Sequence, residues 1–545
     1  MPGSAFPFLA SGWAPGRTVV VDRDMNSHAG HSTSVWMQTA TLPDFPPLKA
    51  DERADVCIVG AGISGLTTAY FCAKAGKSVV VLDDGPIVSG ETERTTAHLV
   101  TALDDRFYEL ERLHGAEGAR LAAESHAAAI DAVERIVLEE RIACEFARLD
   151  GYLFPGPGED PSELDTEYEA ARRAGIKGLE KVAQLPIPSL YAGPALRFAR
   201  QAQFHPLRYL AALAAAAQRL GARIYARTHA AKIHGGNSAA IETTGGPTIR
   251  CDAVVMATNT PVNDRLVIHT KQAAYRTFVV GLEVPAGSVP RALYWDTADP
   301  YHYIRLQSSG SSGTEVLIVG GEDHKTGQAD DQESRWRHLE QWTRSRFPTA
   351  GALRYKWSGQ VMEPVDALAF IGRNPLDHDN VFVATGDSGN GMTHGTIAGL
   401  LLTDLIRGVE NPWAHLYDPR RRTARSAGQY LRENMNMARQ YVDWLTAGDL
   451  EKDQLIPPGT GAVVRAGLRK IAVYRDAAGR FHECSAVCPH LGAIVSWNDA
   501  EETWDCPAHG SRFDCYGHVL NGPANADMHA VETRARESAR SERRK

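Results

Sequence analysis

Two short segments near the C-terminal end carry the residue types that bind transition metals. Each pairs one cysteine with one histidine, Cys488-Pro-His490 in the first and Cys506-Pro-Ala-His509 in the second, and 15 residues separate His490 from Cys506. Thiolates and neutral imidazoles are protein ligands that zinc and iron both accept. The spacing therefore predicts one metal site with two sulfur and two nitrogen ligands.

Two kinds of metal centre could use this ligand set. Two irons bridged by two sulfides would take both cysteines on one iron and both histidines on the other, which is a Rieske [2Fe–2S] centre. A single structural zinc ion would take all four ligands. Zinc sites usually separate a cysteine pair from a histidine pair, whereas each loop here holds one of each, which favours iron and sulfide. Residues 456–531 also resemble the Rieske domain, including the run Gly-Ser-Arg-Phe-Asp at 510–514.

Departures from the respiratory type of Rieske protein predict a low reduction potential. The resemblance implies an additional cysteine in each loop and a tyrosine near the cluster, but this chain has Ala493, Ala508 and Phe513 there. Fewer hydrogen bonds to the reduced cluster stabilise it less, so we expect the lower part of the Rieske range of about −150 to +300 mV. Cys484 and Cys515 are expected to be buried and not to be ligands.

A glycine-rich turn near the start of the chain predicts a dinucleotide site. The apolar run that ends at Val59 meets Gly60-Ala-Gly62-Ile-Ser-Gly65, and a helical pattern follows. Such a turn lets the backbone approach a pyrophosphate at the helix N-terminus. An acid stands 21 residues after Gly62, where it can accept ribose hydroxyls. The predicted contacts are Gly60, Gly62, Ile63, Ser64, Gly65, Asp83 and Asp84.

Two further segments distinguish FAD from NAD. Residues 90–98 follow the acid, and a second glycine-rich turn occupies residues 384–395. With these segments the chain resembles the D-amino-acid-oxidase-like flavoproteins over residues 51–435, and the resemblance implies FAD. The contacts it implies are Arg94, Thr95, Thr96, Ala97 and His98 along the phosphates and flavin, Ala257 at a strand end, and Gly386, Asp387, Gly391, Met392 and Thr393 toward the ribityl chain and ring. Covalent attachment of FAD at His98 is left open.

The pattern of elements predicts three structural units. These are an α/β FAD-binding domain, Rossmann-like and of the glutathione-reductase type, an antiparallel α+β substrate domain, and a small all-β Rieske domain. Helices are expected over 110–141 and 206–220. The expected boundaries are an extended segment 1–50, the oxidoreductase 51–435 (FAD-binding parts 51–110, 200–265 and 365–410; substrate parts 140–200 and 270–365), a linker 436–455, the Rieske domain 456–531 and a charged tail 532–545.

Substrate recognition is the least determined part of the site. Strand alternation over 301–306 would put Tyr303 and Arg305 on one face, where the arginine could clamp a carboxylate and the tyrosine could donate a hydroxyl. An arginine at a solvated strand edge explains the same pattern. Trp357, Gln360 and Asp366 also lie in family-like sequence and are given no role.

The order of the two cofactor regions predicts an electron route. Only 36 residues follow His509, too few for the mononuclear iron domain of a Rieske oxygenase. We expect a dehydrogenase in which a small amine or amino acid gives a hydride to FAD and the cluster passes single electrons to an external acceptor such as a ferredoxin or quinone. Two alternatives remain at this stage, a reductase with reversed flow and a redox-sensing or electron-carrying protein without catalysis.

Composition limits the remaining possibilities. The 545 residues are 43% hydrophobic with a net charge of −8, which describes a globular chain without a field that attracts nucleic acid. Eight cysteines are too few for a disulfide scaffold. The longest apolar stretch tested, 209–217, is too short to cross a bilayer, and no signal peptide is recognisable, so a cytoplasmic location is expected. Translation could start at Met1 or Met25.

Overall fold

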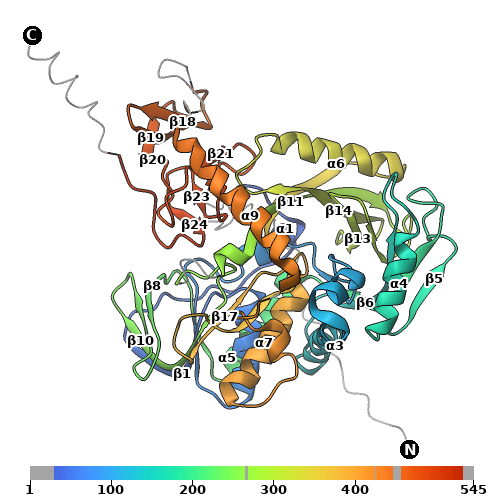
Figure 1. Cartoon of the computed structure of the whole chain (residues 1–545), viewed down its shortest axis with the longest axis horizontal. Helices are drawn as coiled ribbons and strands as arrows, with labels where there is room; N and C mark the ends of the chain where they lie inside the picture. Colours follow the sequence, from blue (N-terminus) through green and yellow to red (C-terminus); the bar gives the residue numbers. More distant parts are fainter. Residues whose placement is uncertain (1–29, 264–267, 423, 446–447, 449–455, 532–545) are drawn as a thin grey trace, which may run out of the picture.

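The computed structural model describes residues 30–263, 268–422, 424–445, 448 and 456–531. In Figure 1 the FAD-binding part lies below, a second sheet covered by α6 lies at the upper right, and the C-terminal β-domain lies at the upper left. The expected tail, residues 446–447 and 449–455 of the expected linker, and both candidate start residues are outside the described residues. None of the helices in the described part is both long and apolar enough to span a membrane.

The FAD-binding part is built on a parallel sheet. Five strands run parallel in the order β17-β10-β1-β2-β7, with β16 antiparallel at one edge and the β8–β9 hairpin joined to β10. Parallel strands covered on both faces are apolar throughout, and β2 and β17 are buried at every residue. The strands are β1 (Glu52–Val59), β2 (Val79–Leu82), β7 (Arg223–Tyr225), β8 (Ala230–His234), β9 (Ala240–Thr243), β10 (Thr248–Met256), β16 (Phe370–Arg373) and β17 (Val381–Thr385).

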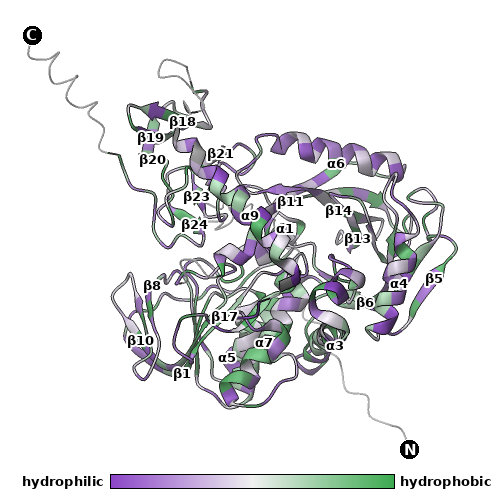
Figure 2. Ribbon diagram, in the orientation of Figure 1, coloured by the Kyte–Doolittle hydropathy of each residue, from purple (hydrophilic) through white to green (hydrophobic). Residues whose placement is uncertain are grey.

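Helices pack together on this sheet with their apolar faces inward. Figure 2 shows hydrophobic residues concentrated on α5 and α7, whereas the outer helix α6 is mostly hydrophilic. Small residues allow close helix approach, since a Cβ at Gly399 of α7 would lie 2.4 Å from the Thr67 side chain of α2. The helices are α2 (Ile63–Lys74), α3 (Phe107–Glu139), α5 (Pro206–Arg219), α7 (Gly391–Arg407) and α8 (Ala414–Tyr417), with the 3₁₀ turns η1 (Glu91–Arg94), η2 (His269–Lys271) and η3 (Ala424–Ser426).

The second sheet has nine strands and is largely antiparallel. Its order is β15-β11-β14-β13-β12-β4-β6-β3, with β5 beside β6 and one parallel pair between β4 and β12. Helix α6 packs against β11 and β14. The strands are β3 (His98–Leu99), β4 (Ala147–Phe154), β5 (Leu179–Val182), β6 (Ala195–Gln203), β11 (Gln272–Pro285), β12 (Leu293–Asp296), β13 (Tyr303–Ser308), β14 (Thr314–Lys325) and β15 (Leu353–Pro364); the helices are α4 (Glu163–Arg173) and α6 (Gln332–Arg346).

The C-terminal domain consists of two small antiparallel sheets around their own core. One has the order β18-β19-β20 and the other β21-β22-β23-β24. Trp504 and Phe513 are fully buried between them, together with the four cysteines of this region. The strands are β18 (Thr460–Ala466), β19 (Arg469–Arg475), β20 (Phe481–Ser485), β21 (Ser496–Asn498), β22 (Thr503–Asp505), β23 (Arg512–Asp514) and β24 (Val519–Asn521).

Two segments expected to be extended or to link domains are packed. Residues 30–50 contain the short helix α1 (Val35–Thr39), and Trp36 is fully buried in the main core. Part of the expected linker belongs to helix α9 (Ala427–Gln440) and the 3₁₀ turn η4 (Tyr441–Leu445), which lie across the two larger units in Figure 1. Tyr441 and Trp444 donate to the carbonyls of Leu491 and Gly492, at 3.0 and 2.9 Å. Both segments therefore join the domains by direct contact.

Candidate functional site

The glycine turn after β1 adopts the close approach that its sequence predicts. Gly60 has φ +101°, and a Cβ there would lie 2.3 Å from the Ala257 carbonyl oxygen. A Cβ at Gly65 would lie 1.8 Å from the Gly60 carbonyl oxygen. The Asp83 carboxylate stabilises the turn by accepting a hydrogen bond from the Ala61 N–H at 2.6 Å. No larger residue fits at 60 or 65, so strand, turn and helix meet closely enough for a pyrophosphate to reach the N-terminus of α2.

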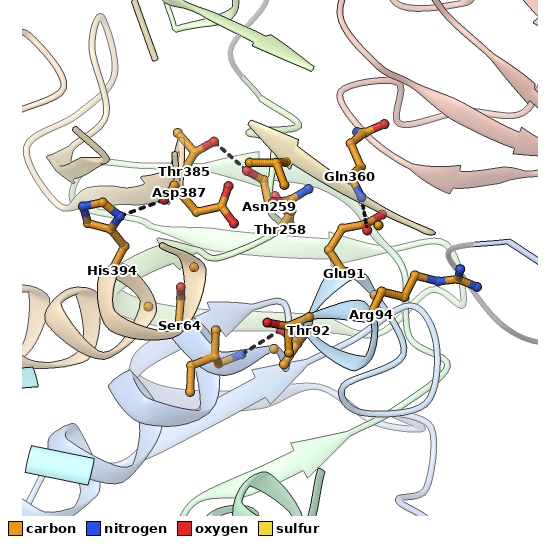
Figure 3. A pocket seen from close by; sticks show the side chains of 18 of the residues that line it. Ser64, Glu91, Thr92, Arg94, Thr258, Asn259, Gln360, Thr385, Asp387 and His394 are labelled. Atoms are coloured by element: carbon orange, nitrogen blue, oxygen red, sulfur yellow. Dashed lines mark hydrogen bonds between the residues drawn. The ribbon is translucent and has the colours of Figure 1, made fainter. Parts of the chain in front are cut away.

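A second glycine turn enters the same cavity from the other side. It joins β17 to α7, and Figure 3 shows Asp387 and His394 on one wall of the cavity opposite Thr92 and Glu91. His394 Nδ1 lies 2.8 Å from the Asp387 carbonyl oxygen. The Asp387 carboxylate accepts the Met362 N–H at 3.1 Å, and burial raises its pKa to about 6. Two helix N-termini thus meet one cavity, which fits a dinucleotide joined to a ring system.

Most of the residues predicted from the sequence lie around this cavity. Gly65, Ala97 and Thr393 do not line it, although each adjoins a residue that does. The predicted residues that line it are Gly60, Gly62, Ile63, Ser64, Asp83, Asp84, Arg94, Thr95, Thr96, His98, Ala257, Gly386, Asp387, Gly391 and Met392.

The guanidinium of Arg94 does not lie where the family resemblance predicts, along the phosphates and flavin. Figure 3 shows this side chain directed away from the cavity. It lies 3.3 Å from Glu501 of the C-terminal domain and donates to the Gly30 carbonyl at 2.7 Å, with its side chain fully buried. Arg94 therefore holds the C-terminal domain and not a phosphate.

Glu501 is the anion at the centre of a buried charge network. Burial alone would raise its pKa, but Arg94, Arg276 and Arg512 outweigh that effect and bring the pKa to about 2. Arg276 lies 3.2 Å from the same carboxylate, and Arg512 lies 3.1 Å from Asp505. Since a buried charge is tolerated only when it is paired, the contacts of Arg94 and Arg276 with Glu501 bind the two domains in one orientation.

The C-terminal domain also closes part of the cavity. Asn521 Nδ2 donates to Glu91 Oε1 at 2.9 Å, and Asn525 Nδ2 donates to the Ala230 carbonyl at 3.1 Å. Gln360 lines the cavity and donates from Nε2 to the Gly510 carbonyl at 3.0 Å. Gly510 directly follows the predicted ligand His509, so the second metal loop touches the cavity wall. The cavity-lining residues of this domain are Val519, Leu520, Asn521, Gly522, Ala524 and Asn525.

The four predicted metal ligands converge in two pairs. The imidazole centroids of His490 and His509 are 5.0 Å apart. Hydrogen bonding between the two buried thiols lowers the pKa of Cys488 to about 7. Within the described residues no three His, Cys, Asp or Glu side chains surround a single ion position, and a two-iron cluster needs only two protein ligands on each iron. The donor set and its pairing fit a [2Fe–2S] centre.

A third histidine at this centre was missed by the sequence analysis. His269, in η2 of the oxidoreductase part, is buried, and its ring centroid lies 4.9 Å from that of His490 and 6.0 Å from that of His509. Gln272, three residues later, donates to the Thr385 hydroxyl beside the second glycine turn at 3.3 Å. No motif surrounds His269, so only the fold places it beside the two histidine ligands.

The two predicted substrate residues have different positions. Tyr303 lines the cavity, and its hydroxyl lies 2.6 Å from the Thr277 hydroxyl. Arg305 does not line it, because it is buried and donates to the carbonyls of Thr96 and Ala97 at 3.0 and 2.9 Å. The expectation that Arg305 clamps a substrate carboxylate is therefore wrong. The arginine supports the loop that carries the predicted flavin contacts.

Comparison with known proteins agrees with this geometry. The family model described as FAD dependent oxidoreductase matches residues 55–405, and that of the Rieske [2Fe-2S] domain matches residues 447–533. This chain belongs to the FAD-dependent oxidoreductase family. It binds FAD, and its C-terminal Rieske domain binds a [2Fe–2S] cluster.

Individual relatives of this FAD-dependent oxidoreductase cover either the whole chain or its larger part. A "putative Rieske 2Fe-2S iron-sulfur protein YhfW" of Bacillus subtilis is 35% identical over 91% of this chain and 97% of its own. A gamma-glutamylputrescine oxidoreductase of Escherichia coli is 24% identical over 69% of this chain and 89% of its own. The crystal structure of glycine oxidase from Geobacillus kaustophilus superposes with a TM-score of 0.56 and 21% identity, covering 68% of this chain and 99% of that one. The last likeness concerns the fold alone.

Proposed function

We propose that the protein is an amine or amino-acid dehydrogenase whose electrons leave one at a time through the Rieske cluster. FAD can accept a hydride from a C–H bond next to nitrogen, and a [2Fe–2S] cluster takes up one electron at a time. The external acceptor is a one-electron carrier such as a ferredoxin or a quinone. The relatives are named for gamma-glutamylputrescine oxidoreduction and glycine oxidation, which supports a substrate with a carbon–nitrogen bond.

The observation that carries this proposal is the contact between the metal loop and the cavity wall. Gln360 reaches Gly510 with one end, and its backbone N–H donates to Glu91 at 2.6 Å within the cavity. His269 covers the two histidine ligands from the oxidoreductase side. A protein in which the cluster served only as a remote sensor would not require this shared wall.

An anaerobic experiment tests the proposal. The holoenzyme is mixed with a panel of amines and amino acids, and flavin absorbance and the reduced-cluster EPR signal are recorded over time. We expect at least one compound to bleach the flavin first and to produce the cluster signal afterwards. Flavin bleaching with a cluster that stays oxidised would contradict the electron route. Reduction by a reduced ferredoxin, with no response to any compound of the panel, would indicate the reversed direction.

Two cysteine variants provide the matched control. Cys506→Ala removes a predicted cluster ligand, whereas Cys515→Ala removes a buried cysteine of the same domain that is not a predicted ligand. We expect Cys506→Ala to retain flavin bleaching and to lose reduction of a one-electron acceptor such as ferricyanide by at least tenfold. Cys515→Ala should retain both reactions. Equal rates of acceptor reduction in the two variants would show that electrons pass to the acceptor from the flavin and not from the cluster.

A further inference from the structure

One end of the cavity lies against the second sheet and is the candidate substrate chamber. Side chains from four neighbouring strands line it, namely Thr277 of β11, Trp295 of β12, Tyr303 of β13 and Asp323 of β14. Tyr301, just before β13, stands beside Tyr303 with the ring centroids 5.4 Å apart. The glycine turns that receive the dinucleotide belong to the other sheet. This end of the cavity is therefore left for the molecule that reacts.

Three carboxyl groups face this chamber. Asp104, Asp323 and Glu363 all line it. Asp104 accepts the Tyr301 hydroxyl at 2.7 Å. The Ser388 hydroxyl is 2.9 Å from both Glu363 and Asp105, although it has only one hydrogen to donate. Asp105 does not line the cavity, so Glu363 is the member of this pair that faces a ligand.

Basic side chains do not balance these acids at the cavity surface. Among the described residues that line the cavity there is no lysine, and the single arginine is Arg94, whose guanidinium is bound to Glu501. Arg106 is nearby but does not line the cavity, and it donates to the carbonyls of Asp104 and Asp296 at 2.8 and 3.1 Å. A substrate carboxylate would meet only carboxyl groups here and no described arginine to receive it.

A buried amide of the second glycine turn lies beside Asp104 and also needs a donor. Asn390 is 5% exposed, lines the cavity, and uses its Nδ2 to donate to the Ser388 carbonyl at 3.0 Å. Its Oδ1 has no hydrogen-bond partner within the described part of the chain. A buried amide oxygen without a donor is costly, so a donor group of the dinucleotide or of the substrate would satisfy it.

The aromatic wall favours the same kind of ligand. Trp295, Tyr301 and Tyr303 line the chamber together with the carboxyl groups. Aromatic faces attract ammonium groups through their quadrupole, and the attraction increases when water is excluded. Carboxylates beside aromatic rings therefore form a receptor for an alkylammonium group and a poor receptor for an anion.

We propose that the substrate is an amine with a second, non-reacting ammonium group and without a free carboxylate, such as a diamine or polyamine. This inference rests on the proposed function and specifies its substrate class. The reacting C–H bond gives its hydride to FAD, the reacting nitrogen loses one proton, and the product is an imine, which water hydrolyses to an aldehyde and ammonia when the reacting amine is primary. The two electrons leave through the cluster to two equivalents of a one-electron acceptor. The second ammonium group stays bound to Asp104, Asp323 or Glu363.

Three probes distinguish the effect of a second ammonium group from the effect of an α-carboxylate. They are 1,4-diaminobutane, butylamine, which lacks the second ammonium, and ornithine, which adds an α-carboxylate to the diamine; 1,3-diaminopropane and 1,6-diaminohexane extend the series in length. Calorimetry on the chemically reduced holoenzyme, which cannot oxidise the probes, gives the dissociation constants. We expect the best diamine to bind at least tenfold more tightly than butylamine and ornithine. Equal or tighter binding of ornithine, or no binding of any diamine, would overturn the proposal.

A charge-removing variant tests the carboxyl groups themselves. Asp323→Asn keeps the shape of the side chain and should weaken diamine binding by about tenfold or more while changing butylamine binding less than threefold. Glu117→Gln, on the exposed face of α3, removes one negative charge that does not line the cavity and should change neither. An equal loss for diamine and butylamine in Asp323→Asn would mean a packing effect and would contradict a cation site.

Failure of the substrate class and failure of the proposed function give different results. A diamine that binds the reduced holoenzyme but never bleaches the oxidised flavin would leave the cation site standing and contradict dehydrogenase activity. An α-amino acid that bleaches the flavin and reduces the cluster, with no diamine bound, would support the dehydrogenase and refute the cationic substrate.

Discussion

Glu501 of the Rieske domain lies 3.3 Å from Arg94 of the FAD-binding domain, with both side chains fully buried. Arg276 reaches the same carboxylate, and Ser32 from the N-terminal segment donates its hydroxyl to it at 2.6 Å. Three parts of the chain that are far apart in sequence therefore meet at one anion. A domain that had to swing between two redox partners would need a weakly bound, solvated interface. The contacts at Glu501 are instead charged, buried and paired, and they hold the Rieske domain against the FAD-binding part.

Replacing Glu501 should weaken the contact between the Rieske domain and the FAD-binding part. Glu501→Gln leaves Arg94 and Arg276 buried without a counter-charge, and breaking a buried pair in this way costs about 3–5 kcal/mol. Because the Rieske domain also lines the FAD cavity, we expect a lower midpoint of thermal unfolding and faster release of FAD on dilution. Calorimetry and flavin fluorescence measure the two effects.

The neighbouring residue serves as the control for that variant. Glu502→Gln makes the same chemical change one position further along, at a partly exposed side chain. It should alter neither the unfolding midpoint nor FAD release. If Glu501→Gln changed the unfolding midpoint and FAD release as little as Glu502→Gln, the buried network would not be what holds the domains together.

A hydroxyl at the cluster should raise its reduction potential. Ser511 is buried, hydrogen-bonds the Cys488 thiol and accepts the Ala524 N–H at 3.0 Å. Hydrogen bonds to cluster sulfur favour the reduced form, so Ser511→Ala should lower the potential by roughly 60 mV, which for one electron corresponds to about 1.4 kcal/mol. Redox titration followed by EPR measures the shift. Ser496→Ala removes another hydroxyl of the Rieske domain, one that donates to the Gly327 carbonyl of the oxidoreductase part, and it should leave the potential unchanged.

The sequence located the cofactor sites because local spacing determines them. A glycine at position 60 or 65 is required by the contact of one turn with one strand, and the metal ligands sit in two short loops. The helix expected over 206–220 begins at Pro206 in the structure because proline suits the first helical turn. Such features depend on neighbours in sequence, so pattern and structure agree.

The parts that sequence could not determine depend on contacts between distant segments. Arginine is the residue type that binds carboxylates, but only the fold shows that the Arg305 guanidinium donates to the carbonyls of Thr96 and Ala97. Arg94 lies in a family-like run, yet its partner Glu501 is 407 residues away. His269 reaches the cluster ligands through the docking of two domains. Chemistry-bearing residues could be recognised from the sequence, but their partners could not.

The glycine turn should tolerate no side chain at its third glycine. Gly65→Ala would place a Cβ 1.8 Å from the Gly60 carbonyl oxygen, so either α2 or the turn has to move. We expect purified Gly65→Ala to contain less than a tenth of the normal FAD, as measured by the flavin released on denaturation. Gly428→Ala, in α9, meets no atom within 4 Å and should retain full FAD content. Normal FAD in both variants would show that the turn can rearrange without loss of the cofactor.

Diamine binding should strengthen as the pH rises through neutrality. Burial raises the pKa of Asp323 to about 7, opposed by a hydrogen bond from Thr277 and by Arg335, whereas Asp104 and Asp299 add to the increase. Below that pH the carboxyl group is protonated and neutral, and above it the group is an anion that attracts an ammonium ion. The dissociation constant of 1,4-diaminobutane should therefore fall several-fold between pH 6 and pH 8. In Asp323→Asn the profile should be flatter over the same range, because the group that ionises has been removed. An equally steep profile in the variant would assign the titration to Asp104 or Glu363. Diamine binding that weakens as the pH rises would contradict an anionic chamber.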